Sequence, residues 1–353
     1  MTPRNSSRRE FVKGGITAGI AASAVANAQA GATQALAQVQ APAVKKNEGG
    51  IPLRPLGKTG EWVTMIALGG HHSTRAKEER DSLKLIQHAV AEGITFLDNA
   101  WDYHDGMSEE RMGKALQEGK IRDKVFLMTK CCGRTAKDAQ THLEDSLRRL
   151  RTDHLDLWQF HEICYDNDPD WIFAQGGAIE YALKAKEQGK IRYLGFTGHK
   201  DPQIHLKMLG KPYDWATVQM PLNVMDGSYR SFQHQVLPVL NQRGIGAIGM
   251  KSLGGDGKIV SQAKVPVDEA LRYVFSLPIS TLVSGIESEK ILEQNLKIVR
   301  EFTPMTAQEM AAVDAKVLYL AGDGRFELFK SSKKYDGPYH REQHGFSVEP
   351  KAV

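Results

Sequence analysis

The sequence is best interpreted outward from residues 96–103, Phe96-Leu97-Asp98-Asn99-Ala100-Trp101-Asp102-Tyr103. Thr95 to Leu97 is typical of a short buried strand, which places Asp98 at the strand end and Tyr103 in the loop that follows. Parallel α/β folds keep their reactive groups at the carboxyl ends of their strands. A phenol has a pKa of about 10 and needs a nearby cation to act as an acid at neutral pH. This stretch therefore predicts a reactive site that also contains a cation and a histidine from other strands.

Short apolar segments alternate with amphipathic helical patterns from Leu53 to about residue 320. The alternation predicts an α/β protein, a single (β/α)8 TIM barrel with an N-terminal β-hairpin around Leu56–Val63. A doubly wound sheet is the alternative, but Gly69-Gly70-His71 after the first strand is not a Gly-x-Gly-x-x-Gly fingerprint. The predicted strands are 65–68, 95–97, 125–128, 155–160, 193–196, 217–220, 245–250 and 281–283, and helical patterns cover 78–91, 136–150, 179–188, 232–242, 267–276 and 288–302.

Four segments are predicted along the chain. Residues 1–30 resemble a twin-arginine export signal, because Arg8-Arg9 precede a weakly apolar run and a small-residue cleavage site that ends at Ala30. Cleavage after Ala37 is the alternative. The apolar run is too short for a permanent span, so we expect export by the twin-arginine machinery to the periplasm and no membrane association of the mature protein. Residues 31–50 are predicted to be a linker, 51–320 the barrel, and 321–353 a C-terminal extension that either packs across the barrel mouth or stays loose.

Composition and charge narrow the class of protein. The 353 residues are 41% hydrophobic and 25% charged, which is enough apolar material for a large core. The net charge of +4 falls to +1 when residues 1–30 are left out, so nothing favours nucleic acid as a partner. The cysteines, Cys131, Cys132 and Cys164, lack the spacing of a disulfide framework or of a Cys-x-x-Cys metal site, and no metal is expected.

Two further reactive side chains stand at predicted strand ends. The third strand finishes in Lys130 and the fourth in His161. The second, third and fourth strands of a barrel are neighbours, so these two residues should face the same pocket as Asp98 and Tyr103. Each of the four alone is better explained by packing or solvation than by catalysis. Together they predict that Lys130, kept charged by Asp98, lowers the pKa of Tyr103, while His161 binds a carbonyl oxygen that the phenol protonates.

These motifs resemble those of the aldo-keto reductases over about residues 53–318. The resemblance rests on residues 97–103, the strand end at Lys130, residues 153–161, Gly195-Phe196-Thr197, Gln219 and residues 285–295. It implies an NAD(P)H-dependent enzyme that transfers hydride to an aldehyde or ketone. It also implies that the catalytic residues are Asp98, Tyr103, Lys130 and His161, with Tyr103 as the general acid.

The same resemblance implies a cofactor site at the remaining strand ends. Thr197, His199 and Gln219 would bind the nicotinamide carboxamide, although the usual Ser-Asn pair of the family reads Thr197-Gly198 here. The loop after the seventh predicted strand offers backbone N–H groups, a hydroxyl and a cation, and these groups suit a pyrophosphate. NADP is the expected cofactor by family habit and NAD is the alternative, because Glu287 would repel a 2′-phosphate. The remaining cofactor-binding candidates are Met250, Lys251, Ser252, Leu253 and Gly254 in that loop, and Gly285, Glu287, Ser288, Gln294 and Asn295 on the adenosine side.

The substrate is a small carbonyl compound, and the candidate substrate contacts are His71 and Trp101. Aromatic side chains around the substrate pocket suit both apolar and sugar-like carbonyl compounds, so the substrate class stays open. One alternative function is a slow-turnover nicotinamide-binding sensor or partner module on the same barrel, which the intact Tyr103 and Lys130 disfavour. Another is a barrel hydrolase that uses Asp98 and a distant carboxylate, and it predicts activity without a nicotinamide.

Overall fold

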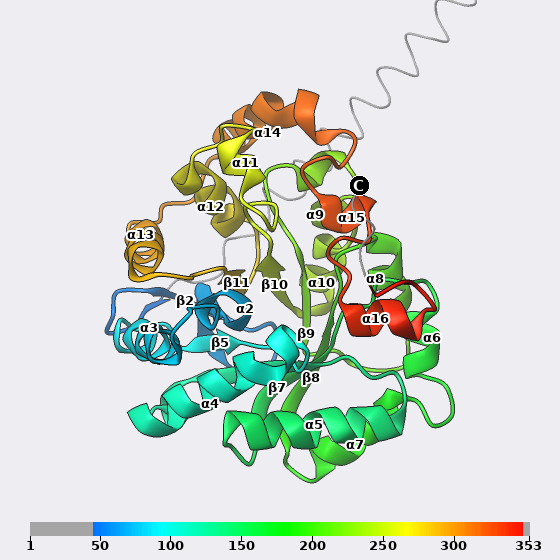
Figure 1. The fold of residues 1–353 in the computed structure, drawn as a ribbon. Coiled ribbons are helices and arrows are strands. Elements are labelled where there is room, and N and C mark those ends of the chain that lie inside the picture. The colour runs from blue at the N-terminus through cyan, green and yellow to red at the C-terminus, as the bar shows by residue number, and fades with distance from the viewer. Residues whose placement is uncertain (1–44, 349–353) are drawn as a thin grey trace, which may run out of the picture. The chain divides into compact units, whose positions relative to one another are not determined.

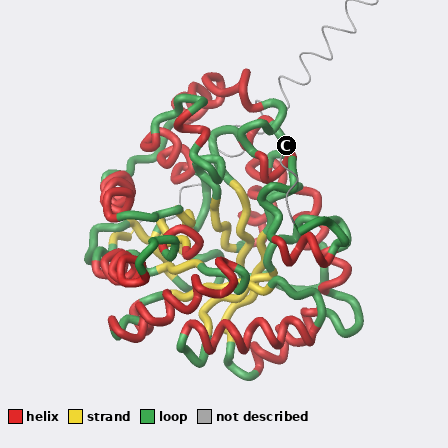
Figure 2. The backbone as a smooth tube through the Cα atoms, in the orientation of Figure 1, coloured by secondary structure: helices red, strands yellow, loops and turns green. Residues whose placement is uncertain are grey.

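Eight parallel strands close into a barrel in the order β10-β11-β4-β5-β6-β7-β8-β9, which confirms the predicted (β/α)8 fold (Figure 1). The structure is a computed structural model that describes residues 45–348, so the predicted export signal lies outside the described residues. Figure 2 shows the strands in yellow at the centre, with helices in red around them. The barrel strands are β4 (Ile66–Gly69), β5 (Phe96–Asp98), β6 (Phe126–Cys131), β7 (Leu155–Phe160), β8 (Ile191–Thr197), β9 (Thr217–Pro221), β10 (Gly246–Met250) and β11 (Thr281–Ser284).

The barrel strands are apolar because both of their faces are covered. Every residue of β6 and of β7 is buried, as expected of parallel strands with side chains inside the barrel and helices outside. Strand β6 continues past the predicted end at residue 128 to Cys131, so Lys130 lies within the strand. The parallel register pairs Asp98 of β5 with Met128, two residues before Lys130, and side chains two apart point to the same face.

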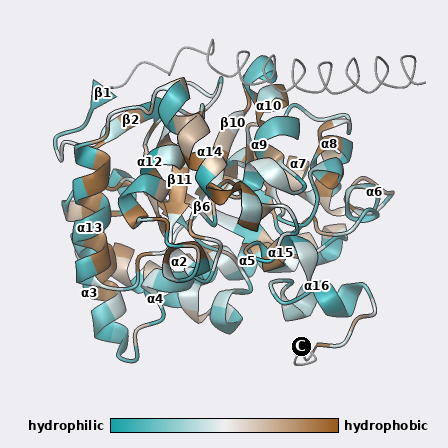
Figure 3. Ribbon diagram, turned by 90° about the horizontal axis from the view of Figure 1, so that it is seen from above, coloured by the Kyte–Doolittle hydropathy of each residue, from teal (hydrophilic) through white to brown (hydrophobic). Residues whose placement is uncertain are grey.

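The helices follow the amphipathic patterns of the sequence, with one break. The pattern predicted over 232–242 divides at Val236 into α9 and α10, because Pro238 lacks the N–H that a continuous helix needs. On α13 hydrophilic and hydrophobic residues lie on different sides of the helix (Figure 3). The helices are α2 (Gly70–Ser73), α3 (Glu79–Ala91), α4 (Met107–Gly119), α5 (Ala136–Leu150), α6 (Asp168–Ile172), α7 (Ala178–Glu187), α8 (Pro202–Leu209), α9 (Phe232–Gln235), α10 (Leu237–Arg243), α11 (Lys258–Ser261), α12 (Val267–Ser276), α13 (Glu289–Arg300), α14 (Ala307–Ala321), α15 (Leu328–Ser331) and α16 (Pro338–Gln343).

A small antiparallel sheet closes the amino-terminal end of the barrel. Its strands are β1 (Lys45–Lys46), β2 (Pro52–Pro55) and β3 (Trp62–Thr64), and β1 lies within the predicted linker. Leu56 and Val63 from this hairpin pack with barrel residues such as Phe96 in one apolar cluster. The buried guanidinium of Arg54 donates to the carbonyls of Phe275, Leu277 and Ile279 at 2.6, 3.2 and 2.9 Å. The hairpin thereby covers this end of the barrel.

The C-terminal extension is folded and packs against the barrel. Its helices α15 and α16 are drawn in red in Figure 1. The fully buried ammonium of Lys330 lies 2.6 Å from Asp226 Oδ1 and 2.9 Å from Glu327 Oε1, which ties α15 to the loop after β9. Of the two predicted arrangements for the extension, the structure therefore has the packed one. Among residues 45–348, no helix combines the length and hydrophobicity needed to cross a membrane.

Candidate active site

Lys130 brings Asp98 and Tyr103 together at the carboxyl end of the barrel. Its ammonium is 1% exposed, donates to the Asp98 carboxylate and to the carbonyl of Asn99 at 2.6 Å, and lies 3.4 Å from the Tyr103 hydroxyl. Tyr103 begins the short 3-10 turn Tyr103–Gly106 after β5. The ammonium also lies 4.9 Å from the centre of the phenol ring. A buried cation thus faces both the carboxylate and the phenol, as the strand order predicted.

His161 completes this group from the next strand. It is the first residue after β7, is 4% exposed, and its backbone N–H donates to the carbonyl of Cys131 at 2.8 Å. Its ring centre lies 5.5 Å from that of Tyr103. Nδ1 of His161 lies 3.0 Å from Oδ1 of Asp102, a partner that the sequence interpretation missed although Asp102 stands next to Tyr103. The Asp102 side chain therefore orients His161 and leaves Nε2 as the ring nitrogen available to a ligand.

The electrostatics of the phenol differ from the prediction. Lys130 was expected to lower the pKa of Tyr103, but that pKa is raised well above its usual value of 10.0. Burial is the first cause, and the carboxylates of Asp98, Asp102 and Glu162 add to it because they disfavour a phenolate. Burial also raises the pKa of Asp98, against the opposing effect of Lys130. Without a ligand, Tyr103 is therefore a protonated phenol at neutral pH.

The two predicted substrate residues differ in their surroundings. His71 meets the Tyr103 ring edge-on, with ring centres 5.2 Å apart, so it borders the candidate site. Trp101 is stacked on His142 with centres 3.6 Å apart, and Tyr339 of the extension contacts it edge-on at 5.4 Å. His71 is therefore placed beside the phenol, whereas Trp101 packs against His142 and Tyr339.

The candidate carboxamide site is formed by the ends of β8 and β9. Thr197 and Gln219 are buried neighbours in register, and Oε1 of Gln219 has no hydrogen-bond partner among the described residues. An unsatisfied buried carbonyl of this kind fits the N–H donor of a carboxamide. Gly198 has no room for the family's Asn, because a Cβ atom there would lie 2.6 Å from the carbonyl of Ile163. His199 is occupied elsewhere, with Nε2 3.3 Å from Asp336 Oδ1 of the extension.

The candidate pyrophosphate loop follows β10 and lies against the extension. Ser252 and Gly254 are buried, and Met250, Lys251 and Leu253 are partly buried. The Lys251 ammonium lies 5.7 Å from the Phe329 ring centre and 5.5 Å from that of Tyr335. Burial lowers the pKa of Lys251. Lys251 and Ser252 of this loop are therefore suited to binding an anion, and aromatic residues of the extension contact Lys251.

The residues predicted for the adenosine side do not all lie together. Ser288 caps α13, with its hydroxyl accepting from the backbone N–H of Ile291 at 3.4 Å. Asn295 is buried and donates to Ser284 at 2.9 Å, whereas Gln294 lies on the other side of α13 in a hollow bordered by α12 and α14. Gly285 is exposed beside the ring of His72. Glu287 is exposed, and Arg75, which the sequence interpretation did not single out, lies 3.9 Å from it.

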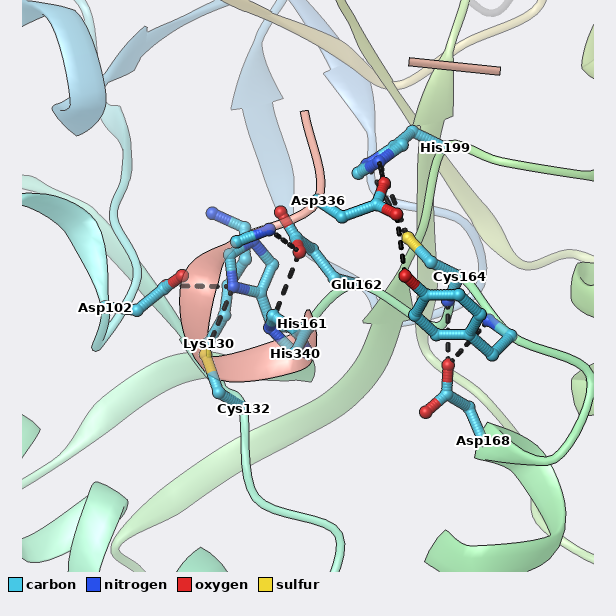
Figure 4. A network of polar contacts seen from close by, with 12 residues as sticks. Asp102, Lys130, Cys132, His161, Glu162, Cys164, Asp168, His199, Asp336 and His340 are labelled. Carbon is cyan, nitrogen blue, oxygen red and sulfur yellow. Dashed lines mark hydrogen bonds and ion pairs between the residues drawn. The ribbon is translucent and has the colours of Figure 1, made fainter. Parts of the chain in front are cut away.

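The extension reaches the catalytic end of the barrel through residues 336–340. Gly337 donates its backbone N–H to Glu162 Oε2 at 2.8 Å, and the rings of His340 and His161 are 5.5 Å apart. Figure 4 shows Asp336 and His340 of the extension beside Glu162 and His161. No sequence period relates these residues to the strand ends, so only the folded chain reveals that the extension contributes to the site.

The fold and this site define a TIM-barrel protein with a Lys-Asp-Tyr-His group at its strand ends. A family model described as "Aldo/keto reductase family" matches residues 65–265, more than half of the chain. The chain belongs to the aldo/keto reductase family, a family of NAD(P)-dependent oxidoreductases. The described residues that offer a carboxamide acceptor, an anion loop and a capped helix fit the nicotinamide cofactor of that family.

Several known proteins are similar to this chain. The aldo-keto reductase YhdN of Bacillus subtilis is 31% identical over 198 residues, which cover 51% of this chain and 55% of that protein. The chain thus matches only about half the length of this relative. L-galactose dehydrogenase of Arabidopsis thaliana is 27% identical over 307 residues, which cover 75% of this chain and 94% of that enzyme. The solved aldo-keto reductase AKR11C1 of Bacillus halodurans, in its holo form, has the same fold, with a TM-score of 0.63 at 23% identity over 75% of this chain and 96% of that one.

Proposed function

We propose that this protein is an NAD(P)H-dependent reductase of an aldehyde or ketone, with Tyr103 as the general acid. The observation that carries the proposal is the position of the Lys130 ammonium, bonded to Asp98 and 3.4 Å from the Tyr103 hydroxyl. A lysine that only ends a strand at the surface, or that only packs in the core, would not need both a carboxylate and a phenol as neighbours. Family membership supports the same class of reaction.

Each residue has one task in this reaction. Tyr103 is protonated at neutral pH and gives its proton to the carbonyl oxygen. The ammonium of Lys130 stabilises the phenolate that remains, and Asp98 balances the charge of the ammonium in the buried site. His161 presents Nε2 to the same oxygen, since Asp102 engages Nδ1, and donates a hydrogen bond from Nε2 when both ring nitrogens carry a proton. A bound reduced nicotinamide supplies the hydride, which no side chain carries.

Steady-state reduction of simple aldehydes, followed by oxidation of NADPH, tests the proposal. Tyr103→Phe should lower kcat by roughly 10²–10⁴-fold, which is the usual contribution of general acid catalysis. Its dissociation constant for NADPH should stay within about three-fold of the wild-type value, because the phenol hydroxyl is not assigned to cofactor binding. Tyr319→Phe is the matched control, since Tyr319 is 79% exposed on α14. Equal turnover by wild type and Tyr103→Phe would refute the role of the phenol.

NADP is the proposed cofactor and NAD the alternative. Glu287 alone would repel a 2′-phosphate, but Arg75 lies 3.9 Å from its carboxylate and offsets that charge. Arg75→Ala should therefore weaken NADPH binding about ten-fold and NADH binding much less, as measured by fluorescence titration. Ten-fold tighter binding of NADH than of NADPH by the wild type would end the preference for NADP.

The second candidate function is a slow-turnover nicotinamide-binding sensor or partner module. It is favoured by the contact of Phe329 and Tyr335 in the extension with Lys251 in the candidate cofactor loop, which would slow exchange of a bound cofactor. Tight NADPH binding without turnover on a broad panel of carbonyl compounds would support the sensor. Steady turnover that depends on Tyr103 would support the reductase.

We further propose that residues 1–30 direct export to the periplasm by the twin-arginine machinery. The support is the Arg8-Arg9 pair ahead of the weakly apolar run 14–26. Replacing both arginines by lysine should leave the protein in the cytoplasm in cell fractionation. Unchanged periplasmic recovery of that double variant would contradict the proposal.

A further inference from the structure

We propose that Asp102, Cys132, His161 and His340 form a binding site for one divalent metal ion, with Zn²⁺ as the best match. The ligand atoms of these four residues all lie within 4.8 Å of one another. A thiolate, two imidazoles and a carboxylate are the donors that tetrahedral zinc sites use. Imidazole and thiolate together also favour zinc over calcium or magnesium.

The four candidate ligands come from three strand ends and from the extension. Asp102 follows β5, Cys132 follows β6 and His161 follows β7, so the barrel supplies three neighbouring ligands. His340 lies in α16 and is the ligand that closes the group. Cys132 and His340 are fully buried, and Figure 4 shows Asp102, Cys132 and His340 around the ring of His161.

Two of the distances between the ligand atoms are close to those of a tetrahedral site, and the others are within 4.8 Å. Cys132 Sγ lies 3.4 Å from His161 Nδ1, and Asp102 Oδ1 lies 3.0 Å from the same nitrogen. Ordinary zinc bond lengths and a tetrahedral angle give about 3.6 Å between sulfur and nitrogen and about 3.4 Å between nitrogen and oxygen. Movements of a few tenths of an ångström would bring these two distances to the tetrahedral values.

Two of these side chains have unsatisfied polar atoms. Among the described residues, Nε2 of His340 makes no hydrogen bond, and Oδ1 of Asp102 makes no well-aligned one although it lies 3.0 Å from His161 Nδ1; both atoms are buried. Nε2 of His340 lies 3.6 Å from Glu162 Oε2, beyond hydrogen-bond distance. Buried polar atoms without a partner are costly, and an unplaced ion is one of their recognised causes. These atoms give the group unused capacity to bind a ligand.

The charges of the group also suit a divalent cation. The Cys132 thiol would release its proton to solvent as the metal–sulfur bond forms. One thiolate and one carboxylate then balance the two positive charges of the ion, which leaves a buried site without net charge.

A second group of metal-ligand residues, Cys164, His199 and Asp336, is less suited to a metal ion. Its carboxylate is already used, because Asp336 accepts from the Tyr165 hydroxyl at 2.8 Å and lies 2.7 Å from the Lys200 ammonium. A cation here would have to displace that ammonium or lie beside it. Hydrogen bonds and an ion pair thus satisfy this second group without a metal.

Metal binding would have two effects on the molecule. It would fix α16 to the barrel through His340, in addition to the contact of Gly337 with Glu162. It would also hold His161 in the tautomer that carries its proton on Nε2, since the metal occupies Nδ1. This second effect rests on the proposed function, in which Nε2 of His161 donates to the substrate oxygen. The metal site itself does not depend on it.

Metal content of the purified full-length protein tests the site. After dialysis against buffer containing one equivalent of Zn²⁺ and then against metal-free buffer, mass spectrometry should find about one zinc per chain in the wild type. Cys132→Ser and His340→Gln should each retain less than about a tenth of that zinc. Cys131→Ser is the matched control, because Cys131 is the adjacent buried thiol and is not in the group. It should keep its zinc, and so should Cys164→Ser from the second group.

Cobalt substitution supplies a readout that does not depend on stability or activity. Co²⁺ bound to the wild type should give the visible bands of a tetrahedral site and a thiolate charge-transfer band, which Cys132→Ser abolishes and Cys131→Ser keeps. The proposal is overturned if the wild type retains no zinc, or if Cys132→Ser with native circular dichroism retains as much zinc as the wild type. Loss of zinc in Cys164→Ser alone would also overturn it. Because no assay of turnover enters this test, its failure would leave the proposed reductase activity untouched.

Discussion

The Tyr103 hydroxyl lies between a nearby ammonium and several carboxylates, and burial together with those carboxylates raises its pKa well above 10. A group with a raised pKa keeps its proton until the pH approaches the raised value. The rate of carbonyl reduction should therefore show no loss attributable to Tyr103 between about pH 6 and about pH 9. Oxidation of the alcohol needs the phenolate and should rise with pH over the same range. A reductive kcat that falls with an apparent pKa near 7, in a manner that Tyr103→Phe removes, would contradict this account.

Asp98 and Lys130 form a buried ion pair, with side chains 4% and 1% exposed. Asp98→Asn removes the negative partner and leaves a buried ammonium uncompensated, which should lower the free energy of unfolding by about 3–5 kcal/mol. Asp214→Asn is the control, because Asp214 is 71% exposed and pairs with Lys58 at 2.8 Å on the surface. Its cost should be below about 1 kcal/mol. Urea denaturation measures both values, and equal costs for the two variants would show that Asp98 is not needed to compensate Lys130.

The C-terminal extension is the segment whose packing on the barrel does not follow from the fold class. Helix α15 is anchored by Lys330, whose ammonium contacts Asp226 and Glu327, all with fully buried side chains. Lys330→Met leaves two buried carboxyl groups without their cation and should lower the free energy of unfolding by about 3–5 kcal/mol. The exposed Lys334 offers the control Lys334→Met, with an expected change of less than about 0.5 kcal/mol. If Lys330→Met left the free energy of unfolding unchanged, the extension would not be held to the barrel by this ion pair in solution.

At the scale of the whole molecule, Asp168 links three distant parts of the chain. Its carboxylate lies 2.8 Å from Arg134 after β6 and 3.0 Å from His344 after α16, and the Arg134 pair holds its pKa below the usual 3.8 although burial acts in the opposite direction. A lowered pKa contributes stability that is present above the unfolded value and is lost as the pH falls toward the folded value. Thermal unfolding midpoints should therefore fall as the pH is lowered below about 4.

Asp168→Asn should remove that contribution. The variant should be less stable by about 3–5 kcal/mol at neutral pH, because the Arg134 guanidinium is left buried without its partner, and the loss of stability in acid should be shallower than in the wild type. Asp166→Asn, at an exposed residue of the same loop, is the control for both measurements. Parallel acid profiles for the wild type and Asp168→Asn would contradict the assignment of the acid transition to this carboxyl group.

The barrel could be predicted because the alternation of short apolar runs and amphipathic helical patterns is local in the sequence. The meeting of four side chains could be predicted because the order of strands in a barrel determines which strand ends are neighbours. Lys130 and His161 could be located from the ends of apolar runs in this way. Asp102, the partner of His161, was not singled out, since the direction of a side chain in a tight turn depends on backbone angles that no periodicity reveals. His340 could not be predicted, because it reaches the site only through the return path of the extension. The pKa of Tyr103 was predicted in the wrong direction for a related reason: part of its charge environment comes from Asp102 and Glu162, which the strand ends alone did not bring into view.

Transfer of deuterium from a labelled reduced cofactor to an aldehyde is the decisive test of the proposed reductase activity. The wild type, supplied with NADPH carrying deuterium at the transferable position, should form an alcohol with deuterium on the former carbonyl carbon. Tyr103→Phe should form that alcohol roughly 10²–10⁴-fold more slowly while still binding the cofactor. Mass spectrometry of the alcohol measures both. An alcohol without deuterium, or equal rates of labelled product from the two proteins, would contradict the account.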